Sequence, residues 1–383
     1  MGLGSTTLLY PPGEFPVTLP AQSLLGARND LPNPYRPGVH WGQLPNGRTW
    51  GSIVGLYPGP DGTVWAFDNC GVVGPGECVG SSLDPILQFD TDGRLLQSFG
   101  KGMFASPHKL TVDPDGNVWV TDNASGPGLG QQVLKFSPDG ALLMALGKAG
   151  VVGSGLDEFD QPTDVAIASN GDIFVVDGHN QNGNNRIVQF SRNGTFIKDF
   201  EETGHGPGQL YGPHAIAMDA NGRLFVADRQ NMRIVIFDRD GNYVNRWTQF
   251  GMPSDIAIDD NGKIYVADSE SDMTQNPGWE KGIRIGDVET GWVEHFILDT
   301  GDNPPITAGG SGRSRAAGSR AGAGGLRTIA PVPLEVHASL LGAGLNGPAL
   351  ALRTILLPCT VLCLPPITKI PLFVGSKTLL LVI

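Results

Sequence analysis

The sequence predicts an all-β protein built from repeated four-stranded units, a β-propeller. Gly and Pro number 55 and 30 in 383 residues, about 22% against a usual sum of roughly 12%, which argues against helical and transmembrane bundles. The hydrophobic fraction is 40%, with 16 Phe, 7 Trp and 6 Tyr, enough for a sizeable core, which argues against wholesale disorder. An internal repeat supplies the strands.

The repeat occurs five times and ends its second apolar run in Asp each time. These residues are spaced by 54, 55, 51 and 40 positions and are Asp68, Asp122, Asp177, Asp228 and Asp268. Asn-Gly or Asp-Gly turns between alternating runs predict hairpins, because both residues of the turn accept positive φ. One unit therefore supplies four antiparallel strands, for example 108–113, 117–122, 132–137 and 141–146. Four-stranded units at this period predict propeller blades.

The elements follow in order from these turns. The first turn of each unit ends at Gly62, Gly116, Gly171, Gly222 and Gly262, and the second at Gly93, Gly140, Gly194, Gly241 and Gly291. The first strand of the first unit is predicted at Trp50–Gly55. Later first strands open with Pro107-His108, Pro162-Thr163, Pro213-His214 and Pro253-Ser254. The Asp residues that end the second strands are expected to be turn and strand-end residues, not catalytic acids.

Residues 208–244, GQLYGPHAIAMDANGRLFVADRQNMRIVIFDRDGNYV, resemble the NHL repeat, and Asn185-Arg186-Ile187 repeats its Asn-x-Arg-Ile feature in shortened form. Arg186 and Arg233 follow this pattern and are expected to pack between blades. The phrases LDPILQFDTDG, QPTDVAIASNGDIFVVDGH and NPGWEKGIRIGD are similar to the peptidyl-α-hydroxyglycine amidating lyase-like branch. The resemblance implies a six-bladed NHL-type β-propeller over residues 41–305, after an irregular N-terminal arm at 1–40.

Five blades are readable, and the sixth, expected just past Pro305, is disrupted. Residues 306–383 are Gly/Arg-rich and then Leu/Pro-rich, with seven Lys or Arg and one Glu, whereas residues 1–305 hold 19 basic and 37 acidic residues. We interpret 306–383 as a non-family tail from a reading-frame shift or a mis-joined gene; the alternative is a genuine disordered extension. Without a sixth blade, blade five and the first strand would present open edges.

The acidic body argues against nucleic acid or an anionic membrane as partner, because phosphate binding needs clustered Lys and Arg. We expect a monomer that binds a small molecule or peptide at one face. Residues 3–10 are too short and interrupted for a signal-peptide core, and 354–368 contain three prolines and are too short for a spanning helix. The resemblance suggests a secreted or extracytoplasmic protein. Cys70 and Cys78 form either a bridge or two free thiols.

Strand direction places the candidate site. The start of each first strand and the end of each second strand lie at the same end of a four-stranded meander, so they converge on one mouth of the central channel. Imidazole suits zinc, and His108 and His214 open two such strands. The simpler alternative is that each His caps a strand. His179 and Arg229 lie just past second strands and share this face. The alternative to a functional role is that His179 is structural or solvent-exposed and that Arg229 only bridges carbonyls.

The resemblance implies roles for these residues. His108 and His214 match two zinc ligands, Arg229 matches an active-site arginine, and Asp255 matches a calcium carboxylate that is joined by the carbonyls of Ile53 and Leu110. Three positions depart from the family: Ser254 at the third zinc ligand, His179 at a Tyr, and Asn69 at an Arg. His179 could restore a three-histidine site or serve as a base.

The leading interpretation is an amidating-lyase-like propeller with a divalent metal in its channel. The alternatives are a non-catalytic propeller that binds a protein or ligand on the same face, and a calcium-dependent propeller lactonase or esterase, for which Asp255 would be needed but the two Pro-His pairs would not.

Overall fold

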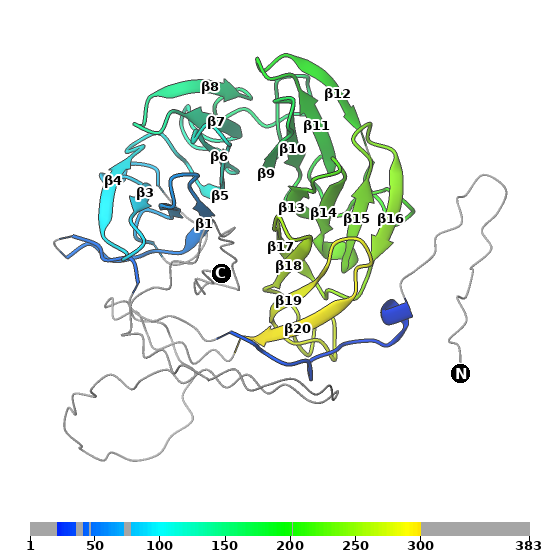
Figure 1. The fold of residues 1–383 in the computed structure, drawn as a ribbon. Coiled ribbons are helices and arrows are strands. Elements are labelled where there is room, and N and C mark those ends of the chain that lie inside the picture. The colour runs from blue at the N-terminus through cyan, green and yellow to red at the C-terminus, as the bar shows by residue number, and fades with distance from the viewer. Residues whose placement is uncertain (1–20, 36–40, 46, 73–77, 201, 300–383) are drawn as a thin grey trace, which may run out of the picture. The chain divides into compact units, whose positions relative to one another are not determined.

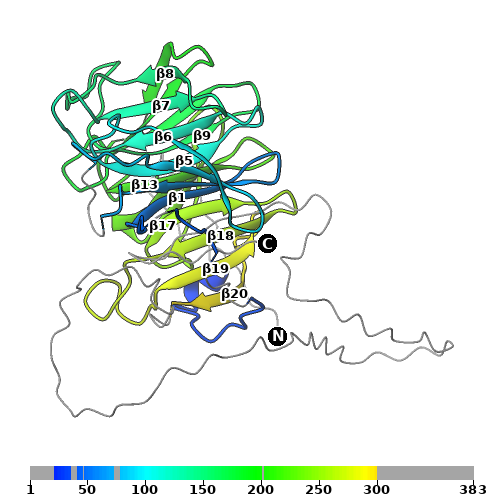
Figure 2. The ribbon, with the colours of Figure 1, turned by 90° about the vertical axis from the view of Figure 1, so that its left-hand side faces the viewer.

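The computed structural model describes residues 21–35, 41–45, 47–72, 78–200 and 202–299. These residues form five separate four-stranded antiparallel sheets, each a meander in chain order (Figure 1). Figure 2 shows the four strands of blade two side by side in sequence order. The prediction of an all-β propeller is confirmed. Among the described residues no helix is long and apolar enough to cross a membrane.

The strand bounds follow the five repeats. Blades one to three comprise β1 (Ile53–Pro58), β2 (Val64–Asp68), β3 (Ile86–Phe89) and β4 (Leu95–Phe99); β5 (Pro107–Val112), β6 (Val118–Asp122), β7 (Gln132–Phe136) and β8 (Leu142–Leu146); β9 (Pro162–Ile167), β10 (Ile173–Asp177), β11 (Arg186–Phe190) and β12 (Phe196–Phe200). Blades four and five comprise β13 (Pro213–Met218), β14 (Leu224–Asp228), β15 (Arg233–Phe237) and β16 (Tyr243–Trp247); β17 (Pro253–Ile258), β18 (Lys263–Asp268), β19 (Gly282–Asp287) and β20 (Val293–Leu298). Two short 3₁₀ turns complete the elements, η1 (Ala21–Leu24) and η2 (Arg229–Asn231).

The blade count differs from the six that the resemblance implies. The described residues contain five blades, so the six-bladed arrangement is not confirmed. The place expected for a sixth blade lies past residue 305, and the hypothesis about the tail concerns 306–383; both are outside the described residues.

The first strand also begins later than predicted. The expected Trp50–Gly55 strand is observed at Ile53–Pro58. The Gly51 N–H donates to Asp68 Oδ1 at 2.7 Å, and the Trp50 ring packs 5.6 Å from that of Phe89. The segment before β1 is therefore held by a side chain, by aromatic packing and by two backbone hydrogen bonds of Ser52 to the loop after β2, and not by regular strand pairing.

The core lies between neighbouring blades. Between blades one and two, Trp65, Phe67 and Phe104 pack with Val118 and Phe136, all at most 2% exposed. The second strand of every blade is buried along its whole length, apart from one half-buried residue in β18. Such apolar runs are expected of strands covered on both faces, which fixes each sheet against the next.

Each inner strand carries a β-bulge near its start. In the pairing of first and second strands, one residue per blade is left over between two register positions: Val54, His108, Thr163, His214 and Ser254. A bulge re-aims the side chain at that point and bends the strand. Equivalent bulges therefore place the two Pro-His histidines at matching positions of two inner strands.

The Asp residue that ends each second strand ties down the segment before the inner strand. Its carboxylate accepts backbone N–H groups there, for example from Tyr211 to Asp228 at 2.7 Å. In four blades an arginine also pairs with this carboxylate: Arg48, Arg186, Arg233 and Arg284. In blade two Asp122 accepts the N–H groups of Ala105 and Ser106 without a cation from the described residues, and burial raises its pKa to about 6. The structural role predicted for these Asp residues agrees with these contacts.

Asp122 should make stability depend on pH. Its pKa in the folded chain is about 6, above the usual value of about 3.9, so the folded state holds a proton that the unfolded state has lost. Raising the pH from about 5 to about 7 should therefore lower the free energy of unfolding by roughly 1 kcal/mol through this group. Denaturant titrations of the wild type and Asp122→Asn at both pH values should show a smaller decrease in the variant.

The control is Asp139→Asn, because a hydrogen bond from Ser137 lowers the pKa of that exposed carboxyl and moves its titration away from this pH window. An identical pH dependence in wild type and Asp122→Asn would contradict the assignment.

Two contacts fix segments that lie outside the strands. Cys70 and Cys78 are joined by a disulfide, with 5.4 Å between their Cα atoms, which answers a question that the sequence left open. In the N-terminal arm, the side-chain amide of Gln22 donates to the carbonyl of Val293 at 2.8 Å, so this segment packs on blade five.

Candidate metal centre

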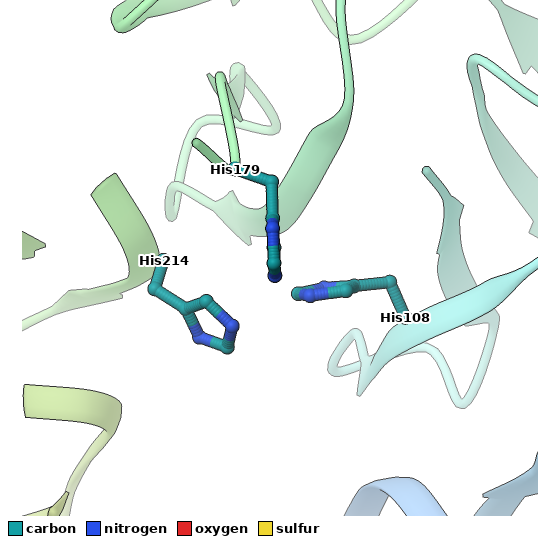
Figure 3. Close-up of side chains that lie close together, drawn as sticks. All are labelled: His108, His179 and His214. Atoms are coloured by element: carbon teal, nitrogen blue, oxygen red, sulfur yellow. The ribbon is translucent and has the colours of Figure 1, made fainter. Parts of the chain in front are cut away.

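Three histidines meet at the channel mouth. His108 and His214 occupy the bulges of β5 and β13, and His179 follows β10. Figure 3 shows the three rings pointing toward one another; their centroids lie 4.8 to 5.0 Å apart. Candidate ligand nitrogens, one from each ring, lie within 4.8 Å of one another. Among the described residues this is the one cluster of three or more His, Cys, Asp or Glu that could hold a metal ion.

The backbone conformation of Gly178 positions His179, the next residue. Gly178 has φ +133°, and a Cβ there would lie 2.4 Å from the backbone nitrogen of Asn185. Because other residues rarely adopt this φ and would collide with that backbone, glycine lets the chain leave β10 closely against Asn185. His179 then follows directly at the channel mouth.

Hydrogen bonds determine which nitrogen of two rings carries the proton. His108 Nδ1 lies 2.7 Å from the carbonyl oxygen of Thr163, and His214 Nδ1 lies 2.7 Å from that of Ser254. A carbonyl only accepts, so each Nδ1 is the donor and each neutral ring keeps a lone pair on Nε2. Each acceptor is the bulge residue of the next blade. This is the orientation expected of a metal-ligating histidine.

The environment keeps the rings uncharged. His108, His179 and His214 are each partly exposed, and protein surrounds most of each imidazole ring. This burial, helped by the Arg229 cation, lowers the pKa of His179 to about 4. Burial likewise lowers the pKa of His108 and of His214 well below the usual range of imidazole. Neutral imidazole, the form that binds metals, therefore prevails near neutral pH.

Arg229 lies beside the cluster at the start of η2. Its side chain is 9% exposed; Nη2 donates to the carbonyl oxygen of His179 at 3.4 Å, and Nη1 lies 4.0 Å from Glu270 Oε1. Its buried Nε has no hydrogen-bond partner among the described residues. A guanidinium whose donors are not all used can bind a carboxylate or another anion by donating hydrogen bonds to it.

The comparisons with known proteins agree with the repeat. NHL repeats match residues 104–126, 159–190, 210–237 and 250–271. The chain is 44% identical over 167 residues to the peptidyl-glycine alpha-amidating monooxygenase of Mus musculus, which covers 41% of this chain and 16% of that protein. It is 34% identical over 174 residues to NHL repeat-containing protein 3 of Mus musculus (44% and 49%). It is 40% identical over 157 residues to peptidyl-alpha-hydroxyglycine alpha-amidating lyase 1 of Drosophila melanogaster (38% and 27%).

The chain is an NHL-repeat β-propeller of the amidating-lyase-like branch. The matched stretch covers less than half the length of each relative above. The residues that match NHL repeats include β5 and β13, on which His108 and His214 lie, and also His179.

In this NHL propeller Ser254 takes no place in the histidine cluster. Its hydroxyl donates to the carbonyl of Ala267 at 3.1 Å and accepts the N–H of Ser269 at 3.0 Å. The position that matched the family's third zinc ligand is thus satisfied by its own blade. His179, which follows the second strand of another blade, stands as the third imidazole instead.

Asp255 lies apart from the histidines and has a partner that the sequence analysis missed. Its Oδ2 lies 2.5 Å from Nζ of Lys109, and its Oδ1 accepts the N–H of Ile256 at 2.8 Å. The contact does not fit a calcium ion on the same Oδ2, where the ammonium already lies. A signal was present, since Lys109 and Asp255 both directly follow a bulge residue.

Proposed function

We propose that this propeller is a metal-dependent lyase of the amidating type, in which His108, His179 and His214 hold a zinc ion and a small or peptide-derived substrate binds at the same mouth. The observation that supports it most is the cluster of three neutral imidazoles, two of which present a bare Nε2. Three imidazoles leave a coordination position open for substrate, as catalytic zinc requires.

Bound zinc would supply Lewis-acid chemistry to a hydroxyl-bearing carbon. The chain's own residues do the rest. Thr163 and Ser254 fix two of the imidazoles through their carbonyls, and the Arg229 guanidinium, which lies beside the cluster, would bind a carboxylate. A peptidyl-α-hydroxyglycine is an N-acyl hemiaminal with a free carboxylate. When its hydroxyl loses a proton to a base, a C=O bond forms and the C–N bond breaks, and the nitrogen takes up a proton, which gives an amide and an α-oxo acid. Arg229 would therefore orient the substrate by its carboxylate.

We also infer a six-bladed arrangement. The inner strands of successive blades, β1, β5, β9, β13 and β17, lie in direct lateral contact, whereas β17 and β1 share no comparable contact among the described residues. Closure of the ring by five blades would bring this last pair together as well. The missing contact supports room for one further blade between blade five and blade one.

Metal content and turnover test the function. We would purify the full chain without chelator, measure zinc and calcium per chain by elemental mass spectrometry, and then assay cleavage of a peptidyl-α-hydroxyglycine. The expected result is near-stoichiometric zinc with cleavage that chelation abolishes. The double variant His108→Ala/His214→Ala is the control and should lose both.

Two results would contradict the proposal. A folded chain that takes up no zinc even when zinc is supplied would leave the histidines as structural residues. Stoichiometric zinc without turnover would favour the non-catalytic alternative, in which the same face binds a ligand.

A further inference from the structure

Each inner strand continues from its bulge residue to one further residue, and we call these five residues the second ring. The positions that directly follow the bulge residues are Gly55, Lys109, Asp164, Ala215 and Asp255. Three of these five are charged. The Lys109–Asp255 contact joins blade two to blade five, which are not neighbours in the order of blades, so it spans the space between the inner strands.

The three charged residues are all buried. Lys109 is 8%, Asp255 6% and Asp164 4% exposed. Both oxygens of Asp164 accept backbone N–H groups, from Val165 at 2.8 Å and from Ile216 at 3.0 Å. A buried carboxylate needs a positive partner because the charged form is otherwise poorly solvated. Lys109 is the cation that this ring contains.

The charges of this ring act on one another. Burial raises the pKa of Asp164 to about 7; the Lys109 cation opposes this rise, and the Asp255 carboxylate adds to it. Two buried carboxyl groups on the inner strands resemble, in charge, part of the oxygen-rich sites that hold calcium. Calcium requires several oxygens at about 2.3–2.6 Å. Here an ammonium already lies 2.5 Å from Asp255 Oδ2.

We propose that the Lys109 ammonium is a built-in cation that takes the place of a metal ion at Asp255, so that the inner strands of blades two and five are held together without calcium. The proposal concerns the second ring alone and does not depend on zinc binding at His108, His179 and His214. It replaces the calcium that the family resemblance implied for Asp255.

The test removes the ammonium. Thermal unfolding of the full chain and of Lys109→Met would be followed in EGTA and in calcium, with calcium binding measured by titration calorimetry. The wild type should bind no calcium in the channel, and its Tm should be the same in EGTA and in calcium. Lys109→Met should unfold at lower temperature in EGTA and regain roughly 5 °C or more in calcium. Adding Asp255→Asn to Lys109→Met should abolish that gain.

Lys135→Met is the matched control, since Lys135 pairs with Asp113 at 3.2 Å within blade two and its loss should create no response to calcium. Calcium binding by the wild type that Asp255→Asn removes would overturn the proposal, as would a folded Lys109→Met that ignores calcium. If Lys109→Met fails to fold, Asp255→Asn decides: an equal loss of Tm in EGTA and calcium supports the proposal, and a calcium-dependent loss overturns it. Zinc content, measured on every variant, separates these outcomes from failure of the histidine site.

Discussion

Replacing His179 by alanine is expected to lower the zinc affinity of the full chain by roughly 100-fold or more. The reason is that losing a residue that only hydrogen-bonds a metal ligand already lowers metal affinity by about 10–100-fold, and loss of a ligand itself should exceed the upper end of that range. The centroids of the three imidazole rings lie within 5.0 Å of one another. Removal of one ring leaves two imidazoles, which are too few to compete with a chelator for zinc. Competition with a chromophoric zinc chelator measures the change directly.

Two control variants test whether the loss of zinc affinity is specific to the cluster of His108, His179 and His214. His205→Ala removes another histidine, one that contacts Asn231 and lies outside the cluster, and should leave zinc affinity unchanged. Ser254→Ala should also leave it unchanged, because that hydroxyl is engaged by Ala267 and Ser269. Zinc binding that survives His179→Ala but falls with Ser254→Ala would place the third ligand where the family resemblance puts it, and the proposed geometry would be wrong.

The largest effect on folding is expected from Arg233→Ala. Arg233 is 4% exposed and its Nε donates to Asp228 Oδ2 at 2.7 Å. The remaining guanidinium nitrogens donate to three carbonyls of the connection between blades three and four, those of His205, Gly206 and Gln209. Removing one partner leaves Asp228 buried and unpaired, which costs about 3–5 kcal/mol. Guanidinium titration in the absence of zinc measures the loss.

The comparison is with an exposed arginine. Arg94 pairs with Asp90 and Asp92 at a turn where its side chain is 68% exposed, so Arg94→Ala should change the free energy of unfolding by less than about 1 kcal/mol. The double variant Arg233→Met/Asp228→Asn should recover part of the loss, because no charge is then left alone. A cost below about 1 kcal/mol for Arg233→Ala would show that Arg233 does not stabilise blade four and the connection that leads into it.

Local features of this chain could be predicted from its sequence. Strand positions follow from the Gly-ending turns and alternating runs, because hairpin turns depend on a few neighbouring residues. The Asp positions, the two Pro-His pairs and the face on which they lie were all predicted in this way. The start of β1 was misplaced by three residues, since a carboxylate from the next strand holds that segment through Gly51.

The side chains that meet between different blades could not be predicted in this way and are known from the packed structure. His179 joins His108 and His214, and Lys109 pairs with Asp255, over separations of 35 residues or more. Periodicity assigns a residue to a face of its own strand but carries no information on the angle between blades, and a bulge shifts that face by one residue. The physical reason is that such contacts depend on how whole sheets pack together, and the repeat specifies each sheet singly.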